Sequence, residues 1–314
     1  MRIVFMGTPE IAVPSLEALV RANFDIIAVY SRPDKPAGRG RAVIQSPVKQ
    51  AALKHGLPVL QPASLRDQQE IERLRQMAPD LIVVAAFGLI LPKTVLDIPA
   101  HKCLNLHPSL LPRYRGPSPI AYAILNGDEE TGVTIMIVTP KVDAGPVLAQ
   151  VTITINPEES TGALQLRLAR AGAELLVNTI PRWIRGEITP RPQDEAMVTL
   201  SGMVAKEDGI IDWSQSAVAL SRRVRAFNPW PGTQTRWRGR VVKIIEADPV
   251  GNCQDLKPGQ VVLVDRAETG FTLGVHTGDG ILRIEKVQLE GRKAISGEKF
   301  LRGQRAIVGE NLPS

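Results

Sequence analysis

The residues best suited to chemistry lie in one short stretch, Asn105 to Gly116, which reads Asn-Leu-His-Pro-Ser-Leu-Leu-Pro-Arg-Tyr-Arg-Gly. Asn105 and His107 are two positions apart at the end of a strand-like run, and such residues point the same way. Both side chains can therefore face one pocket while Leu106 turns into the core. A carboxamide can donate a hydrogen bond to a carbonyl oxygen that becomes negative, and an imidazole can transfer a proton near neutral pH. The pair therefore suits attack on a carbonyl group.

An imidazole in such a pocket usually needs a carboxylate to orient or charge it, and Asp143 is the best-placed candidate. It lies in the sequence Lys-Val-Asp-Ala-Gly-Pro, between two segments predicted to be strands. An isolated Asn-x-His pair is more often structural than catalytic. Three features favour catalysis here: the chain has only four histidines, Pro108 and Pro112 make the following loop rigid, and Asp143 follows on a separate hairpin.

The elements that must position these residues read as an α/β domain. Arg2–Met6 and Phe24–Tyr30 predict strands, and Leu81–Ala86 has the continuous apolar run of a strand buried on both faces. The dinucleotide-binding fingerprint requires three glycines after the first strand, and only Gly7 is present. Gly7 is therefore interpreted as a glycine of a tight turn. Further strands are predicted at 58–60, 131–138 and 147–155, and helices at 11–22, 48–55, 65–77, 120–126 and 160–185.

The proline-containing segment Thr189–Glu195 is the best linker candidate, and the pattern changes after Lys206. From Thr233 onward, short alternating segments broken by glycine and proline predict a small barrel or sandwich. Its strands are predicted at 241–245, 260–264, 271–275 and 281–287, after a helix at 218–227. We therefore expect a catalytic domain at residues 1–189, a linker at 190–207 and a C-terminal domain at 208–314.

Two regions carry excess positive charge in a chain of net charge +6 and sequence pI near 9.5, which favours a polyanionic partner. The first, Ser31–Ser46, is too long for an ordinary βα connection, and its proline and glycine content predicts no regular element. It contains Arg32, Lys35, Arg39 and Arg41. It is either a solvated surface loop or a loop that grips a phosphate backbone.

The second basic region, Leu220–Lys243, holds seven basic residues and no acidic ones, with Phe227, Trp230 and Trp237 interleaved. Two interpretations stay open. The aromatic rings fill a core and the arginines form a solvated rim, or the segment is a basic face that follows a nucleic-acid backbone.

Composition bounds the class of protein. Hydrophobic residues make up 44% of the chain, yet no apolar run approaches the roughly 20 residues of a membrane span, so no membrane partner is expected. The N-terminus reads as a first strand and not as a signal peptide. Cys103 and Cys253 have no metal-ligand spacing and predict a reducing compartment without a disulfide framework. A monomer in the bacterial cytoplasm is expected.

The Asn105–Gly116 stretch, followed by Asp143-Ala-Gly, resembles the signature of the folate-dependent formyltransferases, and the resemblance covers nearly the whole chain. The loop Pro-Ala-Gly-Arg-Gly and the chain length are most similar to those members that act on methionyl initiator tRNA. The resemblance implies transfer of a formyl group from 10-formyltetrahydrofolate to the α-amino group of methionyl-tRNA, with no metal. It also implies a Rossmann-like domain with a mostly parallel sheet and a C-terminal OB-like β-barrel.

The resemblance also implies residue roles. Asn105 donates to the oxyanion, His107 donates there too or shuttles a proton to the leaving nitrogen, and Asp143 orients His107 or accepts the amine proton through water. The 81–91 region shelters the pterin. The residues implied to line the folate pocket are Ser109, Leu110, Leu111 and Pro112. Those implied to contact tRNA are Lys35, Arg39 and Arg41, with Arg39 reaching the acceptor end.

Three other functions stay open. The chain could be a glycinamide ribonucleotide formyltransferase, against which the basic loop and the second domain argue. It could be a formyltransferase of a nucleotide-sugar amine or a folate dehydrogenase fragment, against which the Pro-Ala-Gly-Arg-Gly loop and the chain length argue. It could be an RNA-binding module without catalysis, against which Asn105, His107 and Asp143 argue.

Overall fold

The computed structural model describes residues 1–37, 42–251, 257–266 and 270–314 of the chain. These residues divide into two compact units, which are described separately below. The first unit comprises Met1–Pro119, Glu130–Thr154 and Gln165–Ser201. The second unit comprises Ile120–Glu129, Ile155–Leu164 and Gly202–Ser314.

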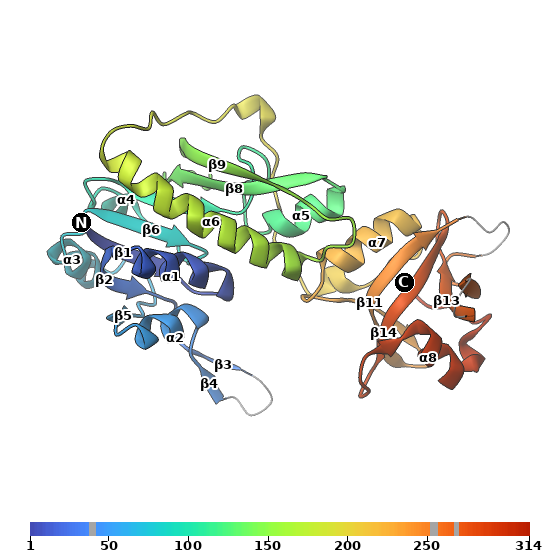
Figure 1. The fold of residues 1–314 in the computed structure, drawn as a ribbon. Helices are drawn as coiled ribbons and strands as arrows, with labels where there is room; N and C mark the ends of the chain where they lie inside the picture. Colours follow the sequence, from blue (N-terminus) through green and yellow to red (C-terminus); the bar gives the residue numbers. More distant parts are fainter. Residues whose placement is uncertain (38–41, 252–256, 267–269) are drawn as a thin grey trace. The chain divides into compact units, whose positions relative to one another are not determined.

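The first unit is built on one sheet that is mostly parallel, as predicted (Figure 1). In spatial order its strands are β5 (Val59–Leu60), β2 (Asp25–Tyr30), β1 (Arg2–Gly7), β6 (Leu81–Ala85), β7 (Cys103–His107), β8 (Glu130–Ile137) and β9 (Val147–Thr154). Neighbours are parallel from β5 to β7, whereas β8 and β9 run antiparallel. The strand β7 therefore has a parallel neighbour on one side and an antiparallel neighbour on the other.

Helices cover both faces of this sheet, because alternate residues of its strands are apolar on both sides. The helices are α1 (Val13–Arg21), α2 (Pro47–Lys54), α3 (Gln68–Gln76), α4 (Lys93–Leu96) and the greater part of α6 (Thr161–Ile184). Ile3 and Phe5 of β1 lie in one buried cluster with residues of α1, α2 and α6. Val4 and Met6 lie in the other, with residues of α3 and α4. The result is a Rossmann-like arrangement of three layers.

The predicted elements of this unit are present with shifted ends. The predicted helix 65–77 is confirmed only as α3, which begins after Asp67 because this side chain caps it by accepting a hydrogen bond from Gln69 N. The expectation of no regular element within 31–46 was wrong. Strands β3 (Lys35–Ala37) and β4 (Ala42–Ile44) form a separate antiparallel pair. Both are edge strands, where Pro36 can lack an N–H without breaking a ladder.

The second unit is an antiparallel sheet with helices, consistent with a small β-barrel, as the predicted fold class required. Its elements are α5 (Pro119–Asn126), α7 (Ala217–Ala226), β10 (Thr233–Trp237), β11 (Arg240–Val250), β12 (Val261–Arg266), β13 (Gly270–His276), β14 (Ile281–Leu289), β15 (Ile295–Ser296) and α8 (Gly297–Gly303). The strand order is β10-β11-β14-β13-β12, and β15 pairs with β14. Sequence analysis did not predict β10 or α8. Their residues Trp237 and Phe300 meet edge to face in the core of this unit.

Among the described helices, none combines the length and the apolar character that a membrane span requires.

Candidate active site

Strand β7 places Asn105 and His107 near the carboxyl end of the parallel strands, where α/β sheets bind ligands. Asn105 lies beside Val84 of β6, and His107 lies opposite Thr134 of β8. Leu106, between them, packs against the buried cluster of Ile3 and Phe5, so its predicted orientation toward the core is confirmed. The pleat of the strand therefore sends the carboxamide and the imidazole to the opposite face from Leu106.

His107 is buried, with 4% of its surface exposed, and both ring nitrogens face oxygen atoms. Its Nε2 is 2.9 Å from the carbonyl oxygen of Tyr114, which can only accept, so Nε2 carries a proton. Its Nδ1 lies 3.6 Å from Oδ1 of Asp143, beyond hydrogen-bond length. Nδ1 is therefore the nitrogen that can gain or lose a proton.

Burial lowers the pKa of His107, while the Asp143 carboxylate and the Tyr114 carbonyl act in the opposite direction. Because burial is the largest influence, the pKa lies below the ordinary value for histidine. The imidazole is therefore neutral near pH 7, with a lone pair on Nδ1 directed toward the side of Asp143.

Asp143 is held in one orientation by its neighbours. Its φ of 49° is left-handed, which is uncommon for a residue with a side chain. Its Oδ2 accepts a hydrogen bond of 3.0 Å from Gly116 N, which leaves Oδ1 for His107. The turn after Asp143 lies close against β8, since a Cβ on Gly145 would come within 1.7 Å of the Ile137 carbonyl oxygen. Only glycine fits there.

The loop after His107 is tied to the two antiparallel strands. Thr134 Oγ1 donates to the Ser109 carbonyl at 2.6 Å and accepts from Leu111 N at 3.1 Å. Gln150 Nε2 donates to the Leu111 carbonyl at 2.9 Å. These bonds, with the 2.5 Å bond from Ser109 Oγ to the Arg113 carbonyl, give the rigid loop that the prolines predicted.

The four residues predicted to line the folate pocket are not equivalent. Ser109 and Leu111 are buried, and Leu111 packs with Met136 and Val147. Leu110 and Pro112 are half-buried. Ser109 and Leu111 can therefore shape the loop, whereas Leu110 and Pro112 can present apolar surface; contact with folate stays a prediction for all four.

Asn105 differs from its neighbours because its side chain has no partner within the described part of the chain. The residue is half-buried, and none of the hydrogen bonds between described residues involves its carboxamide. Its N–H group is therefore available to an oxygen of a ligand.

The region predicted to shelter a pterin, residues 81–91, comprises β6 and the turn that follows it. Ala86 has a φ of 46° and Gly88 a φ of 79°, so the chain turns sharply on leaving the strand. The Phe87 carbonyl accepts a hydrogen bond of 2.9 Å from Thr8 Oγ1, which joins this turn to the end of β1. Ile90 is exposed.

Of the residues predicted to contact tRNA, Arg39 and Arg41 lie outside the described residues, and Lys35 begins β3. The base of this region is fixed. Lys49 Nζ donates to Asp34 Oδ2 at 2.6 Å and to Gln61 Oε1 at 2.7 Å. Gln61 Nε2 in turn donates to Asp34 Oδ1 at 2.7 Å, and the hydrogen bonds from Lys49 and Gln61 lower the pKa of Asp34.

In the basic region 220–243, Phe227 and Trp237 are buried, whereas Trp230 is 59% exposed. The guanidinium of Arg223 donates to the Asp208 carbonyl and lies 4.9 Å from the centre of the Phe227 ring. Aromatic core filling is thus confirmed for two of the three rings.

Several residues that form hydrogen bonds with His107 or Asp143, or support those that do, were not predicted from the sequence. Tyr114 and Arg115 lie within the stretch singled out, but nothing in the pattern marked their roles. Gln193 donates to the Asp143 carbonyl from a position 50 residues away, and no sequence signal pointed to it.

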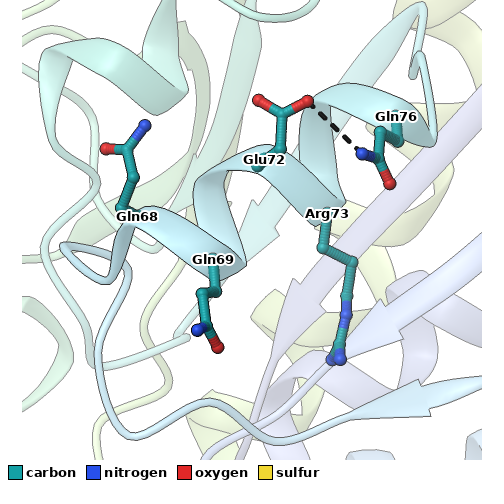
Figure 2. A pocket seen from close by; sticks show the side chains of 5 residues that line it. All are labelled: Gln68, Gln69, Glu72, Arg73 and Gln76. Atoms are coloured by element: carbon teal, nitrogen blue, oxygen red, sulfur yellow. Dashed lines mark hydrogen bonds between the residues drawn. The ribbon is translucent and has the colours of Figure 1, made fainter.

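A shallow hollow on α3 carries no comparable chemistry. Figure 2 shows its lining side chains spread along this one helix, with a hydrogen bond between Glu72 and Gln76. The lining residues are Gln68, Gln69, Glu72, Arg73 and Gln76. Among the described residues, no group of three or more His, Cys, Asp or Glu is arranged to hold a metal ion.

Two family matches cover most of the chain. Residues 1–180 match the family described as Formyl transferase, and residues 203–305 match Formyl transferase, C-terminal domain. A methionyl-tRNA formyltransferase from Roseiflexus sp. (strain RS-1) is 48% identical over 99% of this chain and 95% of the relative. One from Methylococcus capsulatus is 47% identical over 99% of each chain.

Solved structures share the fold at lower identity. HypX from Aquifex aeolicus in complex with tetrahydrofolic acid is 20% identical, with a TM-score of 0.62 over 99% of this chain. The chain spans about half the length of HypX (48%). An N-formyltransferase from Helicobacter canadensis, in complex with folinic acid and dTDP-3-aminofucose, is 20% identical, with a TM-score of 0.65 over 90% of this chain and 97% of that one.

Proposed function

The chain belongs to the formyl transferase family, and from this membership we propose that it transfers a formyl group from 10-formyltetrahydrofolate to the α-amino group of methionyl initiator tRNA. Relatives named methionyl-tRNA formyltransferase match it over nearly their full length, which supports this acceptor. The single observation that carries the chemistry is the convergence of Asn105, His107 and Asp143 at the end of β7. The tetrahydrofolic acid bound to HypX supports folate as the donor class.

The reaction forms a bond between the amine nitrogen and the formyl carbon, and it breaks the bond from that carbon to N10 of the folate. An α-amino group has a pKa of about 7.7–8.0, so a useful fraction is neutral near physiological pH. In the tetrahedral species the former carbonyl oxygen carries negative charge. The free carboxamide of Asn105 donates to it, and such a donor contributes about 2.7–4 kcal/mol to transition-state stabilisation.

One proton must leave the amine and reach N10. His107 has its Nε2 proton committed to Tyr114, so Nδ1 is the position that takes up and returns this proton. Asp143, whose Oδ1 faces Nδ1, stabilises the imidazolium that forms. A second route, in which Asp143 accepts the amine proton through water, uses the same two groups.

The other parts of the proposal concern binding and setting. Lys35, Arg39 and Arg41 contact the tRNA, and Ser109, Leu110, Leu111 and Pro112 form the folate side of the site. The catalytic domain spans residues 1–189, the linker 190–207, and the C-terminal domain 208–314. The protein acts as a monomer in the bacterial cytoplasm.

The test is transfer from labelled 10-formyltetrahydrofolate to four acceptors measured side by side. These are charged initiator methionyl-tRNA, charged elongator methionyl-tRNA, glycinamide ribonucleotide and a dTDP-amino sugar. We expect transfer to the initiator alone. Transfer to a small acceptor would retain the catalytic residues and overturn the assignment of tRNA, and transfer to none would overturn the proposed function.

A further inference from the structure

Residues 191–201, which we call the strap, lie along both partners of His107. The strap is mostly exposed, but its Gln193 side chain turns inward and its Ser201 is buried. All of it belongs to the first unit. At its start, Arg191 and Val147 exchange two backbone hydrogen bonds of 2.8 and 2.9 Å, which fix the strap beside the first residue of β9.

The first contact of the strap is with the turn that carries Asp143. Gln193 Nε2 donates to the Asp143 carbonyl at 2.9 Å and to the Gly145 carbonyl at 2.8 Å. One amide group thus holds the backbone on both sides of Ala144. This matters because Asp143 has a left-handed φ, a conformation that persists only when the surroundings impose it.

The orientation of Gln193 is itself fixed by a buried cation. Arg115, 4% exposed, donates from Nε to Gln193 Oε1 at 2.9 Å. Its other two nitrogens donate to the two carboxylate oxygens of Glu195 at 2.8 and 3.3 Å. Hydrogen bonds from Arg115 and from Lys141 lower the pKa of Glu195 to about 2, so Glu195 stays charged. The amide of Gln193 therefore cannot flip without losing the Arg115 bond.

The second contact of the strap is with the loop that carries the His107 acceptor. Tyr114 N donates to Thr199 Oγ1 at 2.8 Å, and Arg115 N donates to the Thr199 carbonyl at 3.0 Å. Ser201 N donates back to the Arg115 carbonyl at 2.8 Å. Tyr114, like Asp143, has a left-handed φ, of 58°. Its carbonyl is the group that accepts the hydrogen bond from Nε2 of His107.

We propose that the strap is a positioning element of the active site, in which Gln193 sets the Asp143 carboxylate against His107 and Thr199 sets the Tyr114 carbonyl. Its residues act through Asp143 and Tyr114 and are not themselves the catalytic groups. The two oxygens that flank the imidazole come from different loops, and the strap forms hydrogen bonds with the backbone of both loops. This inference rests on the proposed function only for its kinetic readout.

The decisive variant is Gln193→Glu, which keeps the shape of the side chain and removes both N–H donors. Gln193→Ala removes the side chain. Misplacement of a catalytic group by about 1 Å can cost about 100-fold in rate, so we expect kcat to fall by about 10- to 100-fold in each variant. We expect KM for 10-formyltetrahydrofolate to stay nearly constant. Met197→Ala is the matched control, since Met197 lies in the strap with an exposed side chain.

A second readout separates positioning from loosening of the structure, and it needs no substrate. The imidazole of His107 is titrated by NMR, with its signal assigned by its loss in a His107 variant. Burial lowers this pKa and Asp143 raises it. Displacement of Asp143 alone therefore lowers the pKa of His107 further in Gln193→Ala, whereas unpacking that admits water raises it toward the ordinary value.

Two results would overturn the proposed positioning role of the strap. One is a wild-type kcat and an unchanged His107 titration in both Gln193 variants. The other is an upward shift of the His107 pKa that accompanies a loss of stability, which would make Gln193 a packing residue only. If the wild-type protein transferred formyl groups to none of the acceptors, the proposed function would fail, and the NMR titration would still decide the role of Gln193.

Discussion

The loop after β7 and the basic region 220–243 both contain residue types that suit a functional site. They differ in whether those side chains already have partners within the protein. In the first region the most reactive groups are oriented and left available: Asn105 has a carboxamide without a partner among the described residues, and Nδ1 of His107 is short of a hydrogen bond. In the basic region, Arg223 and Arg240 donate to carbonyl groups, and Arg238 pairs with Glu310.

Residue type alone therefore does not decide whether a side chain is available to a ligand. A guanidinium whose donors are already satisfied by protein oxygen must exchange those bonds before it can bind a phosphate, so its net contribution to binding is small. A carboxamide held at a strand end without a partner has no such bond to break. Four experiments test this contrast between the two regions, and the expected effect decreases from the first experiment to the fourth.

The largest effect is expected from the first region. Asn105→Ala removes the oxyanion donor and Asp143→Asn removes the charge beside His107, so each should lower kcat by about 100- to 1,000-fold. Formyl transfer to initiator methionyl-tRNA measures this, with folate binding checked separately. Val142→Ala, at an exposed position beside Asp143, is the control and should retain full activity. Near-normal turnover in both variants that still bind folate would remove this site from the chemistry.

The second effect is on stability and concerns the basic region. Arg223→Ala leaves the Asp208 carbonyl without its donor and removes a cation from the Phe227 ring. We expect the free energy of unfolding to fall by about 1–2 kcal/mol, measured by urea denaturation. Arg236→Ala is the control, because among the described residues this exposed side chain bonds only across a local turn, to the Gly239 carbonyl. Equal, negligible losses would show that Arg223 is not structural.

The third effect is the pH dependence of stability that His107 contributes. Its pKa is lowered in the folded protein, so below about pH 6.5 the unfolded chain takes up a proton that the folded protein refuses. The stabilisation is therefore present above that pH and is lost as the pH falls toward the folded pKa. Urea denaturation between pH 7.5 and 5.5 should show a smaller loss in His107→Gln than in the wild type. A steeper loss in the variant would reverse the sign of the shift.

The smallest effect is expected in the salt dependence of tRNA binding. Lys243 is exposed, so Lys243→Ala should reduce the log–log salt slope by about 0.7–0.9 if one phosphate contact is lost. Arg223→Ala should leave the slope unchanged. Filter binding from 50 to 200 mM salt measures both slopes. A reduced slope in Arg223→Ala would mean that this arginine contacts tRNA despite its bonds to the protein, and the contrast between the two regions would disappear.

The local periodicity of the sequence was enough to predict many of the strands and helices. The apolar run 81–86 predicted β6, and the two-residue spacing of Asn105 and His107 predicted their common face, because strand geometry fixes both within a few residues. Asp143 was found because its turn joins two predictable strands. Likewise, the capping of α3 by Asp67 shortened a helix whose existence the pattern had predicted.

The contacts that could not be predicted are between segments far apart in the chain. Nothing in the sequence around Gln193 indicates that it bonds to Asp143, since the contact depends on the path of the strap in three dimensions. The left-handed conformations of Tyr114 and Asp143 were also missed, because neither residue is the glycine that usually marks such a position. The pair β3 and β4 was missed because the proline and glycine content of 31–46 predicts no regular element, whereas a short edge strand tolerates Pro36.

The path of the strap determines where a chimera between this protein and a relative can be joined without disturbing the active site. The match to the family described as Formyl transferase ends at residue 180, whereas the compact unit that holds the active site extends to Ser201. A chimera joined at residue 180 would take Gln193 and Thr199 from the other parent, and with them the contacts to Asp143 and Tyr114. A junction after Ser201 would transfer the active site together with its supports, so exchange of C-terminal domains between relatives should respect that later boundary.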